Sequence, residues 1–115
     1  MTNKVIVRKE RFSIVKSKSP MKDAFVNIND GKEITAIIDE NKIEKNKIKS
    51  IEKGLKCITF NIILPSSMTG FIAKVSSALA RKKIPIFVIS SYSTDHILIK
   101  EKFLKKAIKT LRELK

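Results

Sequence analysis

The sequence predicts an α+β fold in which helices cover one face of a mainly antiparallel sheet. Short runs of β-branched residues, which are typical of strands, recur along the chain. Two segments, 71–79 and 104–111, instead repeat their apolar residues at helical spacing. In the second half of the chain these patterns follow one another as strand, helix, strand, strand and helix.

The first half of the chain is predicted to be mostly strand. β-Branched runs predict strands at 5–7, 12–15, 24–28 and 34–38. Between the last two lies Asp30-Gly31, a pair that favours a hairpin because glycine accepts a positive φ. We expect one short helix within 39–46, and then a loop with an edge strand as far as residue 56.

The second half shows clearer periodicity. It predicts a half-buried strand at 58–64, a helix from 71 to about 83, a buried strand at 86–89, a strand at 96–99 and a closing helix around 104–111. Pro65 ends the first strand and Pro85 stops the first helix, since proline fits neither a central strand nor a helix interior. Ser67 or Thr69 can supply the side-chain oxygen that caps this helix.

Composition limits the classes of function. A chain of 115 residues with 43% hydrophobic content suits one compact unit, and no apolar run is long enough for a membrane span or a signal peptide core, so we expect a cytoplasmic protein. Cys57 is the only cysteine and His96 the only histidine, so no internal disulfide or familiar zinc set can form. No metal or cofactor is expected.

The net charge of +14 suggests an anionic partner such as nucleic acid. The basic residues are mostly lysines spread along the whole chain, without the interleaved aromatic residues that single-strand binders use for stacking. Lysine, isoleucine and asparagine all have AT-rich codons, so genome composition can explain the excess. We therefore expect only weak, non-specific association with DNA or RNA.

Catalytic motifs are absent from the sequence. There is no Walker loop, no dinucleotide-binding glycine motif and no metal-binding helix. A nominal Ser-His-Asp set at 90–96 fails because neighbouring strand residues Asp95 and His96 point to opposite faces. His96 is interpreted as a structural strand residue and Cys57 as a small core residue, so we expect no enzyme.

Residues 54–115 resemble the ACT-like family that includes small bacterial and archaeal ACT proteins and the CASTOR arginine sensors. The resemblance rests on Gly70, the apolar helix at 71–79, the strand sequence IPIFVIS at 84–90, the turn SYSTD at 91–95 and the strand HILI at 96–99. It implies a ferredoxin-like ACT fold, with a reduced ACT-like half at 1–53 and a complete βαββα half at 54–115, packed as one domain. The strong positive charge and Pro65-Ser66 depart from the family pattern.

The resemblance also implies a regulatory role through binding of a small molecule, most simply a free amino acid. A ligand-free interaction domain and a basic nucleic-acid-binding module are the alternatives. ACT domains commonly pair, and one complete copy lacks the second copy that builds a site in tandem relatives. The resemblance therefore implies a homodimer.

An amino-acid site needs a cradle for the α-carboxylate, a carboxylate for the α-ammonium and a pocket wall. Backbone N–H groups at the opening of a helix can hold the carboxylate, and the family motif places Asp95 where it can accept a bond from the ammonium. The expected ligand-binding residues are Ser67, Met68, Thr69, Gly70, Phe71, Ile72, Ser91, Tyr92 and Asp95. Equally, Thr69 can serve only as a helix cap and Asp95 only as a hairpin residue bonding its own turn.

Overall fold

The computed structural model describes residues 5–61 and 70–114, which fall into two units. Unit 1 comprises Met1–Lys9 and Lys56–Lys115, and unit 2 comprises Glu10–Leu55. The units divide between residues 55 and 56, and the first nine residues belong to the same unit as the C-terminal part. They do so because strand β1 (Val5–Val7) pairs antiparallel with the end of strand β5 (Ile48–Phe60), with Val5 opposite Phe60.

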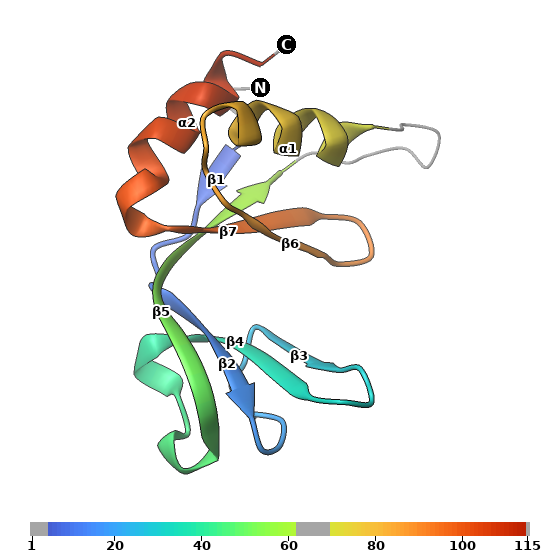
Figure 1. Cartoon of the computed structure of the whole chain (residues 1–115), viewed down its shortest axis with the longest axis vertical. Coiled ribbons are helices and arrows are strands. Elements are labelled where there is room, and N and C mark those ends of the chain that lie inside the picture. The colour runs from blue at the N-terminus through green and yellow to red at the C-terminus, as the bar shows by residue number, and fades with distance from the viewer. Residues whose placement is uncertain (1–4, 62–69, 115) are drawn as a thin grey trace. The chain divides into compact units, whose positions relative to one another are not determined.

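Unit 2 is built on antiparallel strands (Figure 1). They are β2 (Phe12–Ser17), β3 (Val26–Asn29), β4 (Ile34–Asp39) and the first part of β5, in the order β3-β4-β2-β5. Two short 3-10 helices, η2 (Glu40–Lys42) and η3 (Lys45–Lys47), join β4 to β5 where one short helix was expected. Val15, Met21, Ala36 and Ile38 form the buried core of this unit.

The predicted hairpin at Asp30-Gly31 is confirmed. The Asp30 carboxylate accepts hydrogen bonds of 2.9 Å from the backbone N–H groups of Lys32 and Glu33. These two bonds, with Glu33 contributing most, lower the pKa of Asp30 below its ordinary value. Gly31 has φ of +89°, a value that a residue with a Cβ rarely adopts.

The prediction of a loop and a separate edge strand before residue 56 is wrong. Residues 48–60 form one continuous strand, β5, of 13 residues. Its polar first part pairs antiparallel with β2, with two shifts of register, and it contains Gly54 at φ of +75°. Pairing with a neighbouring strand thus outweighs the charged composition that argued against a strand here.

Unit 1 places two helices over one face of its strands (Figure 1). Its elements are β1, the end of β5, α1 (Phe71–Arg81), β6 (Phe87–Ser90), β7 (Asp95–Lys100), the short 3-10 helix η4 (Glu101–Phe103) and α2 (Leu104–Arg112). β7 lies between β5 and β6, and β1 pairs with β5. The predicted helices and the strand, helix, strand, strand, helix order are confirmed, and β1 supplies the fourth strand of a ferredoxin-like sheet.

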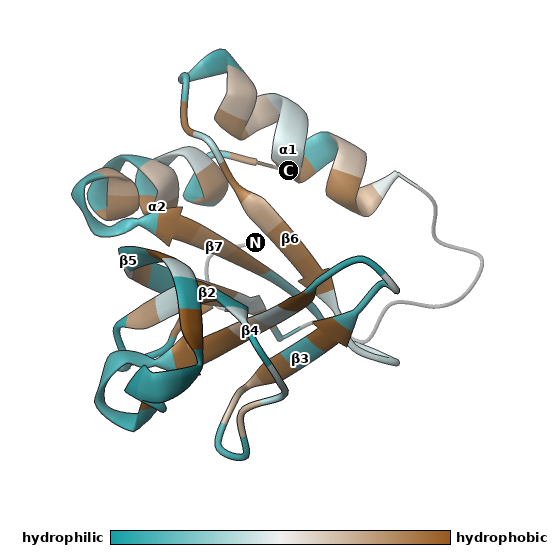
Figure 2. Cartoon of the chain, turned by 60° about the horizontal axis from the view of Figure 1, so that its bottom comes forward, coloured by the Kyte–Doolittle hydropathy of each residue, from teal (hydrophilic) through white to brown (hydrophobic). Residues whose placement is uncertain are grey.

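The core of unit 1 lies between its strands and its helices, and Figure 2 shows how apolar β6 and β7 are. Its buried members are Ile58, Phe60, Val75, Leu79, Ile84, Ile97, Ile99, Ala107 and Leu111. Burial of one such aliphatic or aromatic side chain contributes about 1.5 to 3 kcal/mol.

One expectation about unit 1 is wrong. The strand after Pro85 is not buried, because β6 is an edge strand of the described sheet on which Phe87 is 43% and Val88 is 44% exposed. An apolar run alone does not distinguish a central strand from an edge strand, which explains the error. The residue at the N-cap of α1 is Gly70, which has no side chain to accept a hydrogen bond, and the predicted caps Ser67 and Thr69 lie outside the described residues.

Candidate ligand-binding site

Helix α1 opens on a glycine in a left-handed conformation. Gly70 has φ of +80° and ψ of 6°, and a Cβ added there would meet no described atom within 4 Å. The backbone angle, rather than crowding by described atoms, therefore accounts for a glycine here. The first helical hydrogen bond runs from the Lys74 N–H to the Gly70 carbonyl, so the N–H groups of Phe71 and Ile72 precede the helical ladder.

Phe71 anchors this helix start to the core of unit 1. Its ring meets the ring of Phe60 edge to face, with 5.3 Å between centroids and 83° between planes. Phe60 itself is 1% exposed, whereas Phe71 and Ile72 are half-buried. Because the Phe71 side chain is held by packing, its backbone N–H and that of Ile72 have a fixed position at the positive end of the helix dipole.

Three further predicted residues lie at the turn between β6 and β7: Ser91 and Tyr92 within the turn, and Asp95 at the start of β7. The Ser91 N–H and hydroxyl both donate to the Thr94 carbonyl, at 2.9 and 3.1 Å, and close the turn. The Ser90 hydroxyl donates to Asp95 Oδ1 at 2.5 Å. Tyr92 is fully exposed at the tip of the turn.

The fold places the helix start and this turn at the same end of unit 1. Figure 1 shows β5 and β6 running toward that end, with α1 beginning there and β7 returning from it. Gly70, Phe71, Ile72, Ser91, Tyr92 and Asp95 therefore share this end. The predicted site residues Ser67, Met68 and Thr69 lie outside the described residues.

A buried polar row crosses unit 1, and sequence reasoning did not find it. Arg8 Nε donates to Thr59 Oγ1 at 3.0 Å, and Thr59 Oγ1 lies 2.9 Å from Nδ1 of His96. With the Arg8 N–H directed at its oxygen, the Thr59 hydroxyl can donate its proton to Nδ1, so we assign the imidazole proton to Nε2. The sequence separates these residues by 51 and 37 positions, so no local pattern could reveal the row.

The environment of His96 favours its neutral form. His96 is 5% exposed, and burial, followed by the positive charge of Arg8, lowers its pKa below the ordinary 6.5, while Asp95 opposes the shift. His96 bonds Thr59 and Asp95 accepts from Ser90, so these contacts do not form a Ser-His-Asp relay. Cys57 is buried, with Sγ 4.0 Å from Thr59 Oγ1, in agreement with a core role.

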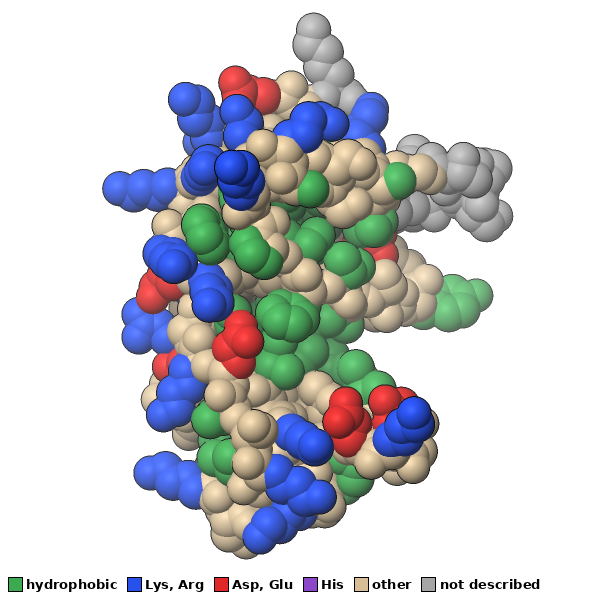
Figure 3. Space-filling view, viewed as in Figure 1, with side chains coloured by type: hydrophobic (Ala, Val, Ile, Leu, Met, Phe, Trp, Pro, Cys, Tyr) green, Lys and Arg blue, Asp and Glu red, His purple; other side chains and the backbone are tan. Residues whose placement is uncertain are grey.

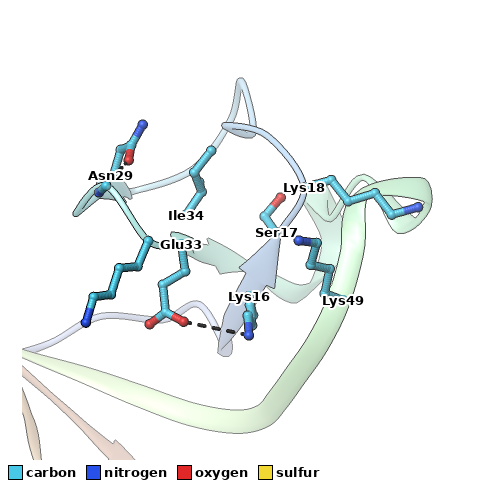
Figure 4. A pocket seen from close by; sticks show the side chains of 9 residues that line it. Lys16, Ser17, Lys18, Asn29, Glu33, Ile34 and Lys49 are labelled. Atoms are coloured by element: carbon cyan, nitrogen blue, oxygen red, sulfur yellow. Dashed lines mark hydrogen bonds and ion pairs between the residues drawn. The ribbon is translucent and has the colours of Figure 1, made fainter.

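Unit 2 contains a second polar feature that the sequence did not suggest, a basic pocket of about 220 Å³. Figure 4 shows Lys16 of β2 paired with Glu33, and Lys49 of β5 on the far side of the pocket beside Ser17; Lys16 Nζ lies 3.8 Å from Glu33 Oε1. The lining residues are Lys16, Ser17, Lys18, Asn29, Gly31, Lys32, Glu33, Ile34 and Lys49. Four lysines against one carboxylate suit a small anion.

The described part of the chain offers neither a metal site nor a membrane-spanning helix. Within 5–61 and 70–114, no group of three or more His, Cys, Asp or Glu side chains is placed to hold a metal ion. None of the helices in that part of the chain combines the length and the apolar character needed to cross a membrane.

Several solved structures share the fold of the chain. A protein from Agrobacterium tumefaciens superposes with a TM-score of 0.82 at 21% identity, over 94% of this chain and 85% of that one. A Vibrio cholerae protein described as a possible transport protein gives 0.81 at 16% identity, over 96% and 88%. The ligand-free regulatory subunit of aspartate kinase from Thermus thermophilus gives 0.70 at 9% identity, over 95% of each chain.

At these identities the solved structures establish the fold alone. No protein with a curated description matches the sequence. The family model for the ACT domain matches residues 50–113, more than half of the chain and nearly all of the C-terminal part of unit 1. The chain therefore belongs to the ACT domain family.

Proposed function

We propose that this protein is a non-catalytic regulatory ACT domain protein that binds a free amino acid at the end of unit 1 where α1 begins. The observation that carries the proposal is that the α1 opening at Gly70 and the Asp95 carboxylate share this end of an ACT domain. One element offers positive backbone dipoles and the other a negative charge. A zwitterion needs both.

The roles follow from the charges of the ligand. The α-carboxylate would be held by the backbone N–H groups of Gly70, Phe71 and Ile72, because these groups lie before the helical ladder and at the positive end of α1. The α-ammonium would donate to the Asp95 carboxylate, which already accepts from the Ser90 hydroxyl through Oδ1. A carboxylate has capacity for several donors, so the hairpin bond and the ligand bond are compatible.

We further propose that the protein acts in the cytoplasm as a homodimer that pairs through β6. An edge strand presents unpaired backbone groups, and β6 adds exposed Phe87 and Val88 to them. The fully exposed Tyr92 follows in the adjoining turn. Pairing of two copies would cover these apolar side chains and complete the edge.

A thermal-shift screen of the intact protein against the twenty amino acids tests the proposed function. We expect one amino acid, or a small chemically related group, to raise the melting temperature in a concentration-dependent manner. A ligand at 100 times its Kd adds about 2.7 kcal/mol to the free energy of unfolding, which shifts the melting temperature of a domain of this size by several degrees. No shift with any amino acid at 10 mM would contradict the proposal.

The alternative function is a protein interaction domain that needs no ligand. The bond between Ser90 and Asp95 favours it, because Asp95 then has a sufficient structural role within its hairpin. The exposed apolar side chains of β6 also suit a protein partner. A protein that dimerises through β6 and ignores all twenty amino acids would match this alternative.

A further inference from the structure

The positive charge is distributed unevenly between the two units. Unit 1 carries fifteen basic and three acidic residues, a net charge of +12, whereas unit 2 carries ten and eight, a net charge of +2. Basic residues make up about one residue in five in both units, so lysine-rich composition does not distinguish them. The difference in net charge comes from the small number of carboxylates in unit 1. A bias toward lysine codons would raise the number of lysines in both units, so it does not explain why only unit 1 has few carboxylates.

The uncompensated charge lies largely on the helices of unit 1, and Figure 3 shows Lys and Arg side chains gathered over α2. We call this surface the basic helix layer. Its exposed cationic residues are Lys74, Arg81, Lys82, Lys83, Lys102, Lys105, Lys106, Lys109 and Arg112, and its acidic residues are Glu101 and Glu113. The layer therefore carries a net charge of +7.

Helix α2 arranges part of this charge as a row. Lys105, Lys109 and Arg112 follow at steps of four and three residues, which places them on one helix face, and they border a shallow groove of about 410 Å³. The opposite face is occupied by packing, since Ala107 and Leu111 are fully buried. At 1.5 Å per residue the row is about 10 Å long, about the rise of three phosphates along one strand of a duplex.

The side chains of the basic helix layer favour duplex nucleic acid over a lipid surface or a single strand. Binding to a lipid surface through a helix needs large apolar side chains that enter the membrane, but among the described residues the exposed ones lie on β1, β3, β6 and the β6–β7 turn. Single-stranded nucleic acid is held by stacking on exposed aromatic rings. The two aromatic rings on these helical segments, Phe71 and Phe103, are half-buried: Phe71 packs edge to face on Phe60, and Lys102 Nζ lies over the Phe103 ring, 5.2 Å from its centroid.

We propose that the basic helix layer of unit 1 binds the phosphate backbone of duplex nucleic acid without sequence preference. Lysine point charges suffice for such contacts because phosphates carry the charge and bases are not read. The expected dissociation constant at physiological salt lies at about 1 to 100 μM, in the range of non-specific binding. This activity is independent of amino-acid binding at the end of unit 1.

Fluorescence anisotropy with a labelled 20-base-pair duplex tests the proposal. The variant Lys105→Gln/Lys109→Gln/Arg112→Gln removes three charges from α2, and Lys42→Gln/Lys45→Gln/Lys53→Gln removes three exposed charges from unit 2. Both variants keep a net charge of +11, so they differ only in where the charge was lost. Melting curves of both variants should agree with the parent within a few degrees.

We expect the α2 variant to bind the duplex at least tenfold more weakly than the parent, and the unit 2 variant to bind within about twofold. Losing three phosphate contacts should also reduce the slope of log K against log salt by about 2.7. Equal weakening by both variants, or no binding of the parent in 50 mM salt, would overturn the proposal. Tighter binding to vesicles of anionic lipid than to the duplex would also overturn it.

Discussion

At the scale of single residues, the row of Arg8, Thr59 and His96 shows how unit 1 accommodates a polar side chain within its apolar core. Each contact joins side chains from different strands or their ends, with Arg8 next to β1, Thr59 on β5 and His96 on β7. A buried imidazole without a partner would cost about 1 to 3 kcal/mol, so the Thr59 hydroxyl both satisfies Nδ1 and fixes the tautomer.

The lowered pKa of His96 predicts a loss of stability in mild acid. The unfolded state takes up a proton near pH 6.5 while the folded state still resists it, so the unfolded state binds more protons as the pH falls. The contribution of His96 to the free energy of unfolding is fully present above about pH 7.5. As the pH falls through 6.5 toward the pKa of His96 in the folded state, this contribution is lost, with a slope of at most about 1.4 kcal/mol per pH unit. Urea unfolding at pH 7.5 and 5.5 measures it.

The matched variant is His96→Asn, whose side-chain oxygen can accept from Thr59 near the position of Nδ1 but does not titrate. Its free energy of unfolding should change less between the two pH values than that of the parent. The same change in both proteins would show that His96 does not carry the pH dependence.

At the scale of elements, the hairpin of β3 and β4 could be predicted because its cause is local. Asp30 and Gly31 meet the bonding and backbone needs of the turn within four residues. The helices α1 and α2 could be predicted equally well, since the spacing of their apolar residues indicates which face is buried. The residues of the hairpin and of the two helices are therefore sufficient to predict these elements.

The strands that sequence reasoning misjudged depend on distant partners. The first part of β5 is a strand because β2 pairs with it, and nothing within 48–55 reports that pairing. β6 looks like a buried strand by composition, yet β7 is its only partner among the described strands, and Phe87 and Val88 are exposed. The position of a strand within a sheet is a property of topology, which local composition does not encode.

The exposed edge of β6 gives a direct test of the proposed dimer. Phe87→Lys places a charge on this edge and should abolish pairing, so sedimentation at tens of micromolar should show a mass near 13.1 kDa in place of twice that value. The matched control is Ile28→Lys on β3, the edge strand of unit 2, where the side chain is 45% exposed. We expect the control to remain dimeric.

A parent protein that sediments only as a monomer would contradict the dimer proposal. If Ile28→Lys were a monomer and Phe87→Lys remained a dimer, the interface would lie on β3 of unit 2 rather than on β6 of unit 1. Melting curves of the Phe87→Lys variant should confirm that the variant still folds, because the side chain is only partly exposed.

At the scale of the whole molecule, the sequence predicted the ACT-type fold of the C-terminal part but not how the chain completes it. The strand, helix, strand, strand, helix order supplies three strands, and the fourth comes from Val5–Val7 at the opposite end of the chain. Three β-branched residues near the N-terminus predict a strand without naming its partner. The basic pocket of unit 2 could not be predicted from the sequence for the same reason, since its residues come from β2, β5 and the β3–β4 turn.

The fold bears on the candidate site only through the placement of its elements. The family motif and the helix-opening pattern predict Gly70, Phe71 and Asp95 as ligand-binding residues, and the fold places the start of α1 and the start of β7 at one end of unit 1. Their role in binding stays a prediction. The sequence left open whether Asp95 bonds its own hairpin or a ligand, and it could not identify Ser90 as the partner, because that contact depends on geometry rather than on residue type.

The central claim is that an amino acid binds between the start of α1 and the β6–β7 turn, and backbone amide NMR of the intact ¹⁵N-labelled protein tests it most directly. With each of the twenty amino acids at 10 mM, the account predicts that one ligand or a related group shifts the amides of Gly70, Phe71 and Asp95. Asp95→Asn should weaken the affinity for that ligand about 30-fold, because it removes a charge-assisted bond worth about 2 kcal/mol. The hairpin should stay intact, because the Asn amide oxygen can still accept from the Ser90 hydroxyl. Asp30→Asn, which alters the hairpin carboxylate of unit 2, should leave the affinity unchanged. The absence of any response, or shifts centred on Lys16 and Glu33 in the basic pocket of unit 2, would contradict the account.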